Sequence, residues 1–331
     1  DTVAGTRSSG RNTVQFLIDG GGVIAPALAA IDIAKKSVHI SVFQFQADEV
    51  GWNLTRILAA KARKGVKVRV LLDEHGSAVK KDPEALKLLA FMSANGIEVR
   101  VQKAPLLKGH LDHRKVMVID GDVGFTGGMN IGNLYQVDWH DQQTLIIGPA
   151  VAALQDAFLE KWKANGGETG SEEDLYPPLR EVENGAETRV VMHRGGQDQN
   201  IKAMYLRAFA TAQKSIRIAN PYFADPEIVK ALSAAALRGV RVQVVLPEDN
   251  DQKLVQRASR SYYTDMIKAG IEIYEYKGMA HEKVAVIDGY WSTFGSSNLD
   301  SRSLVNNDEL NLVVTDSVLA DYISRRLFDV D

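Results

Sequence analysis

The chain repeats one pattern of polar residues at two places, and this duplication restricts the fold more than any other feature of its 331 residues. Both copies read H-x-K-x4-D-x6-G-(G/S)-x-N, without a gap or an insertion. The first copy begins at His113 and the second at His281. The match continues downstream, because Asp141 and Glu309 follow their histidines at the same interval. A match of this length indicates that the chain consists of two related halves.

The similarity between the halves extends upstream of the motif. In three further pairs of segments a helix ends and a strand rich in β-branched residues follows. The pairs are residues 34–43 with 212–221, 64–72 with 238–246, and 95–99 with 269–273. Each half therefore reads strand–helix–strand–helix–strand–strand–helix, and this alternation predicts an α/β fold.

The duplication predicts two similar α/β/α lobes. Each lobe is expected to contain a mixed, largely parallel sheet flanked by helices. An internal pseudo-twofold axis is expected to relate the lobes, with the active site at their interface. Residues 1–165 are assigned to the N-terminal lobe, residues 166–186 to a connector, and residues 187–331 to the C-terminal lobe. The connector is assigned from its glycines, prolines and acidic residues.

The composition argues against several classes of function and of binding site. A net charge of −3 argues against a general nucleic-acid coat, so no dedicated nucleic-acid partner is expected. The absence of cysteine excludes disulfides and thiolate metal sites. No apolar run reaches the ~20 residues that a membrane-spanning helix needs. Because the first residue is Asp1, we expect a processed chain that is secreted or periplasmic, with a peripheral membrane or cytoplasmic location as the alternatives.

In each copy of the motif, His and Lys are placed on one side of a strand end. One residue separates them, and the segments that follow, residues 116–119 and 284–287, are predicted to be buried strands. Side chains at positions i and i+2 of a strand face the same side. An Asp-Gly turn then leads to a second strand, which is expected to return the motif Asn to the same edge.

This pattern indicates chemistry at a phosphodiester. Lysine ammonium and amide NH2 groups suit phosphate oxygens, one imidazole can attack phosphorus, and a second can protonate the leaving oxygen. The trailing carboxylates can orient the imidazoles, and no metal is required because the lysines supply positive charge. The candidate catalytic residues are His113, Lys115, Asn130 and Asp141 in the first half and His281, Lys283, Asn298 and Glu309 in the second, with Lys115, Lys283, Asn130 and Asn298 as phosphate ligands.

Four other motif residues are expected to be structural. Asp120 and Asp288 lie a strand length from their histidines, so we expect them to cap a turn or to bond loop backbone. Gly128 and Ser296 are small and let the backbone come close to whatever the site binds. The remaining histidines are interpreted as packing or surface residues, with the one nearest the motif as the leading exception. These are His39, His75, His140 and His193, with His110 as the exception.

The paired motifs resemble the two HKD motifs of the phospholipase D superfamily. Residues 139–141, 147–151 and 295–303, together with Phe158 and Trp162, resemble its bacterial cardiolipin synthase-like and phospholipase D-like branch. The resemblance implies a metal-independent phosphodiesterase or phosphatidyltransferase that needs no cofactor and works through a phospho-histidine. It also implies His113 as nucleophile and His281 as acid and base, although the residues alone leave the two histidines equivalent.

The leading functional hypothesis is a phospholipase D-type enzyme that hydrolyses or transphosphatidylates glycerophospholipids. The alternatives are a cardiolipin synthase-type phosphatidyltransferase and a nuclease, against which the net negative charge counts. A non-catalytic scaffold is disfavoured because every expected motif residue is present. We expect a phospholipid substrate, a monomer with an internal pseudo-twofold, and peripheral membrane contact, for which the apolar and basic residues 105–108 are suited.

Overall fold

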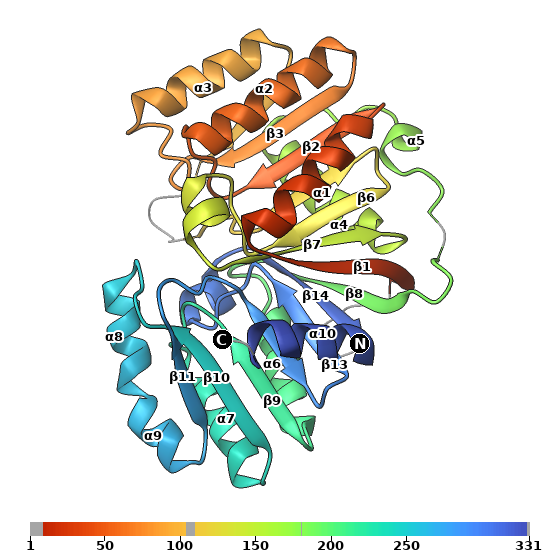
Figure 1. Cartoon of the computed structure of the whole chain (residues 1–331). Helices are drawn as coiled ribbons and strands as arrows, with labels where there is room; N and C mark the ends of the chain where they lie inside the picture. Colours follow the sequence, from red (N-terminus) through yellow and green to blue (C-terminus); the bar gives the residue numbers. More distant parts are fainter. Residues whose placement is uncertain (1–8, 104–109, 180, 330–331) are drawn as a thin grey trace. The chain divides into compact units, whose positions relative to one another are not determined.

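A computed structural model describes residues 9–103, 110–179 and 181–329 (Figure 1). The expected membrane-contacting loop at residues 105–108 therefore lies outside the described residues. The chain divides into two compact units, Ser9–Gly185 and Ala186–Asp331, and each is described by itself.

The segment expected to be a connector belongs almost entirely to the N-terminal unit. Arg69 donates from Nη1 to the carbonyl oxygen of Thr169 at 2.8 Å, and Trp162 donates from Nε1 to that of Glu168 at 2.9 Å. These bonds hold the first part of the segment against the unit.

The N-terminal unit contains a sheet with the strand order β1-β7-β6-β5-β2-β3-β4. The strands are β1 (Arg11–Ile18), β2 (Ser37–Val42), β3 (Lys67–Asp73), β4 (Glu98–Gln102), β5 (Val116–Ile119), β6 (Val123–Gly127) and β7 (Gln142–Ile147). The helices are α1 (Asp19–Ile33), α2 (Glu49–Arg63), α3 (Pro83–Ala94), α4 (Ala150–Ala164), α5 (Glu172–Leu175) and the π-helical turn η1 (Leu134–Asp138). Both faces of β2 are covered, because His39 contacts Gln155 of α4 whereas Ile40 lies with residues of α1 and α2.

The C-terminal unit repeats this architecture with the strand order β8-β14-β13-β12-β9-β10-β11. The strands are β8 (Ala186–His193), β9 (Ser215–Ala219), β10 (Arg241–Pro247), β11 (Glu272–Tyr276), β12 (Val284–Ile287), β13 (Trp291–Gly295) and β14 (Glu309–Thr315). The helices are α6 (Asn200–Thr211), α7 (Pro226–Leu237), α8 (Lys253–Ser261), α9 (Tyr263–Lys268), α10 (Ser317–Leu327) and η2 (Arg302–Asn306). Strand for strand the two orders correspond, which confirms two similar α/β lobes.

The sheets are mixed, as predicted, but the expectation that they are largely parallel is wrong. In the N-terminal sheet β2 pairs in parallel with β3, and β3 with β4, whereas the pairs β2–β5, β5–β6, β6–β7 and β1–β7 are antiparallel. The C-terminal sheet has the same pattern. Crossover helices connect the parallel strands, while a short turn makes the hairpin pairs β5–β6 and β12–β13 antiparallel. The predicted element order also has only four strands in each half, whereas the structure has seven.

A short turn closes each motif hairpin. Ile119 pairs with Val123, and the first two residues between them, Asp120 and Gly121, have φ angles of 52° and 75°. The second hairpin repeats this with φ angles of 54° and 66° at Asp288 and Gly289. Aspartate and glycine tolerate this left-handed region better than other residues do, so the Asp-Gly sequence permits the turn.

In the described part of the chain, every helix is too short or too polar to cross a membrane.

Candidate active site

The motif hairpins carry the His and Lys of each half into buried positions. His113 and Lys115 immediately precede β5, and only 8% and 1% of their surfaces are exposed. His281 and Lys283 precede β12 and are 3% and 0% exposed. Burial strengthens electrostatic interactions, so a buried lysine can attract a phosphate more strongly than a solvated one.

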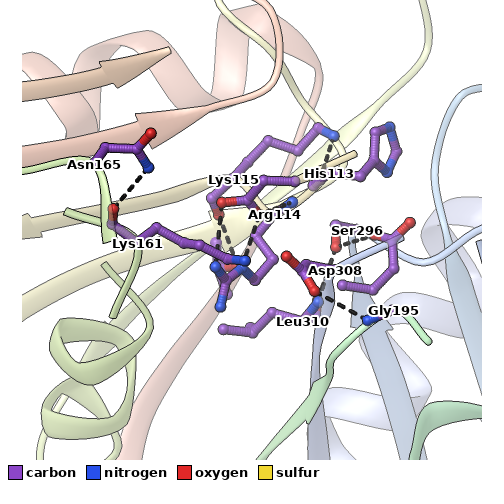
Figure 2. Close-up of polar contacts among 12 residues, drawn as sticks. His113, Arg114, Lys115, Lys161, Asn165, Gly195, Ser296, Asp308 and Leu310 are labelled. Atoms are coloured by element: carbon purple, nitrogen blue, oxygen red, sulfur yellow. Dashed lines mark hydrogen bonds and ion pairs between the residues drawn. The ribbon is translucent and has the colours of Figure 1, made fainter. Parts of the chain in front are cut away.

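Each motif lysine folds back on the backbone of its own histidine. Lys115 donates from Nζ to the carbonyl oxygen of His113 at 2.7 Å (Figure 2), and Lys283 does the same to His281. An ammonium has three donors, so this bond fixes the side chain and leaves donors for other groups. In each half the structure thus ties the lysine to the histidine's own backbone.

Aromatic rings lie beside both imidazoles. The centroid of the Phe43 ring is 5.2 Å from that of His113 in an edge-to-face arrangement, and the Lys115 ammonium lies 5.6 Å from the Phe43 centroid. In the second half the ring of Tyr222 lies edge-to-face with His281 at 6.4 Å. These contacts restrict the rotation of the imidazoles.

The residue between His and Lys differs between the halves. Arg114 forms a bidentate ion pair with Asp112, with Nε to Oδ1 at 2.8 Å and Nη2 to Oδ2 at 3.1 Å. Both side chains are buried, so the pair fixes the chain just before β5. The second half has Glu282 and Ala280 at these positions, and this ion pair is therefore not duplicated.

The two motif asparagines are held differently. The Oδ1 of Asn130 accepts a hydrogen bond from the backbone N–H of Gln44 at 3.1 Å, so the NH2 group of Asn130 points away from that N–H. Asn298 donates its backbone N–H to Ser303 Oγ at 2.9 Å, and its buried Oδ1 has no hydrogen-bond partner among the described residues. An amide NH2 is the donor that a phosphate oxygen requires.

The trailing carboxylates are buried at the starts of β7 and β14. Asp141 is 1% exposed, and its Oδ1 accepts the backbone N–H of Gln142 at 2.8 Å. Glu309 is 0% exposed and accepts hydrogen bonds from Ser296 Oγ at 2.5 Å and from Ser303 Oγ. Serine hydroxyls thus orient the second carboxylate, whereas a backbone amide holds the first.

Ser296 does more than provide a small side chain. Its Oγ also accepts the backbone N–H of Leu310 at 3.0 Å (Figure 2), which ties β13 to β14. Its backbone N–H donates to the carbonyl of Leu310 at 2.9 Å, just as that of Gly128 donates to Gln142 at 3.0 Å. Sequence reasoning missed the hydroxyl's contact with Glu309, although the Gly-to-Ser difference between the copies was its visible sign.

Asp120 and Asp288 bind backbone at the start of a neighbouring strand. The carboxylate of Asp120 accepts N–H groups from Lys35, Lys36 and Ser37 at 2.7–2.8 Å. Asp288 does the same with residues 213–215. Burial opposes ionisation of Asp288, but these backbone amides outweigh it and lower the pKa of the carboxyl. Both aspartates therefore join the hairpin turn to the entrance of β2 or β9.

Comparison with known proteins shows the family. Residues 27–162 and 205–329 match the family described as cardiolipin synthase, PLD-like domain. The chain belongs to this family. The cardiolipin synthase of Geobacillus kaustophilus is 38% identical over 318 residues, and the probable cardiolipin synthase of Bacillus subtilis is 34% identical over 322. These alignments cover 91% and 93% of the chain but 63% of each relative's length.

Solved structures show the same fold at low sequence identity. Phosphatidylserine synthase from Haemophilus influenzae superposes with a TM-score of 0.76 at 16% identity, covering 98% of this chain and 88% of that one. Polyphosphate kinase from Porphyromonas gingivalis gives a TM-score of 0.61 at 15% identity, covering 94% of this chain and 46% of that one. At these identities the likeness concerns the fold alone.

Several residues that support the family motifs were not predicted. Asp19 has a φ angle of 57°, donates its N–H to the carbonyl of Asp141 at 2.8 Å, and accepts the N–H of Asp141 through Oδ1 at 3.1 Å. The same oxygen lies 2.8 Å from Nδ1 of His140, which was interpreted as a packing or surface residue. The start of α1 is thereby fastened to the backbone of a candidate catalytic carboxylate.

The helix that follows β2 or β9 is tied to the segment after the motif Asn. Asp48 caps α2 through Gly51 at 3.0 Å and also accepts the backbone N–H of Asn133 at 2.6 Å. Asp225 caps α7 and accepts a hydrogen bond from Ser301 at 3.1 Å. An aspartate before a helix is a recognisable capping signal, but its second partner is visible only in the structure.

Proposed function

We propose that the chain is the phosphatidyltransfer unit of a cardiolipin synthase-type enzyme. The family membership and the names of the curated relatives support this reading, which was the alternative to phospholipase D-type hydrolysis. Hydrolysis has support only at the level of the superfamily. The observation that carries the proposal is the duplicated His–Lys pair, buried in both halves with the lysine bonded to the histidine's own backbone.

In the first step, an imidazole nitrogen of His113 attacks the phosphorus of a donor phospholipid. A bond between nitrogen and phosphorus forms, and the bond from phosphorus to the head-group oxygen breaks. His281 enters as an imidazolium and gives its proton to that oxygen, so the head-group alcohol leaves neutral. The product is a phosphatidyl-histidine.

In the second step, a hydroxyl of an acceptor loses its proton to the now neutral His281. The acceptor oxygen attacks phosphorus, the bond to His113 breaks, and both histidines return to their starting states. Cardiolipin contains two phosphatidyl groups joined by one glycerol, so its formation requires the hydroxyl of a phosphatidylglycerol as acceptor. Water as acceptor would give phosphatidic acid instead.

The buried lysines and asparagines suit the charge that this reaction develops. Lys115 and Lys283 would place ammonium groups against the equatorial phosphate oxygens, where negative charge grows at the transition state. Asn130 and Asn298 would add neutral donors. Asp141 and Glu309 would orient the imidazoles and stabilise the positive charge on the protonated one, as the aspartate of a Ser-His-Asp triad does.

Product analysis tests the proposal. Purified protein is incubated with phosphatidylglycerol vesicles, and lipids and released glycerol are quantified by mass spectrometry. Cardiolipin with one glycerol per cardiolipin is expected. Phosphatidic acid alone would support hydrolysis, and no turnover of any phospholipid would refute both readings. His113→Asn should abolish the product, whereas His75→Asn, the same change in an exposed loop, should not.

The joint action of His113 and His281 stays a prediction and has its own test. Phosphatidylglycerol labelled with ³²P in its phosphate is mixed with enzyme and denatured in base, which preserves phospho-histidine. Label is expected on the peptide containing His113 and absent from the His113→Asn variant. Label on His281 instead would reverse the assigned roles, and full activity of a His281→Asn variant would show that one histidine suffices.

A further inference from the structure

The N-terminal unit contains a cavity of about 240 Å³ between α1, α2 and the sheet. Most of its walls are apolar. Val23, Ile24, Ala27, Leu28 and Ile31 come from α1, Val50, Leu54 and Ile57 from α2, and Ile40, Val42, Val116, Met117, Met129 and Ile131 from the sheet and the loop after β6.

The cavity also reaches the motif. Lys115 and Asn130, the proposed phosphate ligands of this half, contribute to its walls, together with Gln143 of β7. One cavity is therefore lined mainly by apolar side chains and also by the two proposed phosphate ligands of this half. A ligand that matches these walls has a hydrocarbon chain joined to a phosphate.

The duplicated half supplies an internal comparison. Ala27 of α1 and Tyr205 of α6 lie at the same distance from the ends of their helices, Ile33 and Thr211. Both helices are followed by an alanine with nearly the same backbone angles, φ of −55° and −56°. The two positions therefore correspond.

In the C-terminal half, a large side chain occupies this position. Tyr205 is 1% exposed, and its hydroxyl accepts a hydrogen bond from Asn311 Nδ2 at 3.2 Å. Asn311 is the counterpart of Gln143, because each lies two residues after its half's trailing carboxylate. Where the C-terminal half places the Tyr205 hydroxyl against the Asn311 amide, the N-terminal half has Ala27 and an open cavity.

We propose that this cavity binds one acyl chain of the phospholipid whose phosphate is held by Lys115 and Asn130. The proposal rests on the proposed function and adds the subsite for the hydrocarbon. A cavity of ~150 Å³ in another protein accommodates benzene, so this one has room for an alkyl segment of roughly ten carbons. Apolar walls offer water few hydrogen bonds. Each methylene of an alkyl chain that is buried there raises the affinity of the ligand about fourfold.

The test measures binding, so that it does not depend on turnover. Decyl phosphate, below its micelle concentration, and butyl phosphate are titrated into the full chain by isothermal calorimetry. Decyl phosphate should bind at least about tenfold more tightly. Ala27→Tyr, which copies the C-terminal half, should remove most of this preference. Ala29→Tyr adds the same side chain on the exposed side of α1 and should preserve it.

Equal affinities for the two phosphates, or equal effects of the two tyrosine variants, would overturn the proposal. If Ala27→Tyr does not fold, a diazirine-bearing decyl phosphate is cross-linked to the unmodified chain. Labelling should fall on peptides covering residues 23–31 or 50–57, and labelling confined to other peptides would contradict the assignment. Chain-length-dependent binding without transfer of phosphatidyl groups would retain the cavity's role and reject the proposed function.

Discussion

His39 should make the N-terminal half sensitive to acid. The imidazole is fully buried in β2, stacks on Phe158 at 4.8 Å, and has Nδ1 3.2 Å from Gln155 Oε1. Burial, more than any other influence, lowers the pKa of His39 from 6.5 to about 4; the hydrogen bond with Gln155 opposes this shift, and the nearby charge of Arg69 contributes to it. The folded chain therefore keeps this ring neutral.

The sign of the effect follows from proton uptake. Between pH 6.5 and pH 4 the unfolded chain binds a proton at His39 that the folded chain rejects. The stabilising contribution is complete above pH 6.5 and is lost as the pH falls toward 4. Each pKa unit corresponds to about 1.4 kcal/mol, so a difference of about 2.5 amounts to at most about 3–4 kcal/mol, of which about 3 kcal/mol is lost by pH 4. This is a large part of the stability of an ordinary domain.

Urea unfolding at pH 7 and at pH 4, followed by tryptophan fluorescence, measures this loss. His39→Asn removes the titrating ring and keeps an amide that can bond Gln155. The variant should be less stable than the unmodified chain at pH 7 but should lose about 3 kcal/mol less between the two pH values. His75→Asn is the matched control in an exposed loop. If the His39→Asn variant lost as much stability between pH 7 and pH 4 as the unmodified chain, the reasoning would be refuted.

Four further predictions follow from the site. Ser296→Ala should lower turnover about tenfold, because Glu309 loses a hydroxyl donor; an unchanged kcat would reject the orienting role. Burial, aided by the charge of Glu309, raises the pKa of Asp300 from 3.8 to about 6, so stability is lost as the pH rises between these two values, and the gain in melting temperature of Asp300→Asn should grow from about pH 4 to about pH 6. Asp120→Ala should lower the free energy of unfolding by about 2–3 kcal/mol, since three backbone amides lose their acceptor; a loss below 0.5 kcal/mol would contradict this. EDTA should leave phosphatidyl transfer unchanged, and restoration of a lost rate by a divalent metal would disprove the metal-free chemistry.

The duplication made much of the fold predictable, because two copies of a pattern reveal elements that either copy alone would leave ambiguous. The motif strands, the Asp-Gly turns and the helix ends at Gly65 and Gly239 are dictated locally, by burial periodicity and by backbone conformation. The antiparallel strand β1 was missed because its place depends on pairing with β7, more than a hundred residues away, as Phe16 with Thr144 shows.

The candidate site was predictable to the same extent. The motif residues are visible in the sequence because their spacing is repeated. Asp19 and Asp48 were not predicted as supporting residues, and Ser296 was predicted only for its small size, because each acts through a partner that only folding brings near. Nothing in the residues around Asp19 shows that its carboxylate will accept the N–H of Asp141, 122 positions later.

The sequence separations of the residues in these contacts also imply an order of folding. The bond from Thr126 Oγ1 to the carbonyl of Lys115 spans 11 residues and lies inside one hairpin, whereas the bonds between Asp19 and Asp141 span 122. Contacts close in sequence form at lower entropic cost than distant ones. We therefore expect the His–Lys hairpin to be organised early, and the carboxylate at the start of β7 to be fixed only when α1 docks. A chain stalled before that docking would carry a formed His–Lys hairpin while the Asp141 carboxylate was not yet held in place.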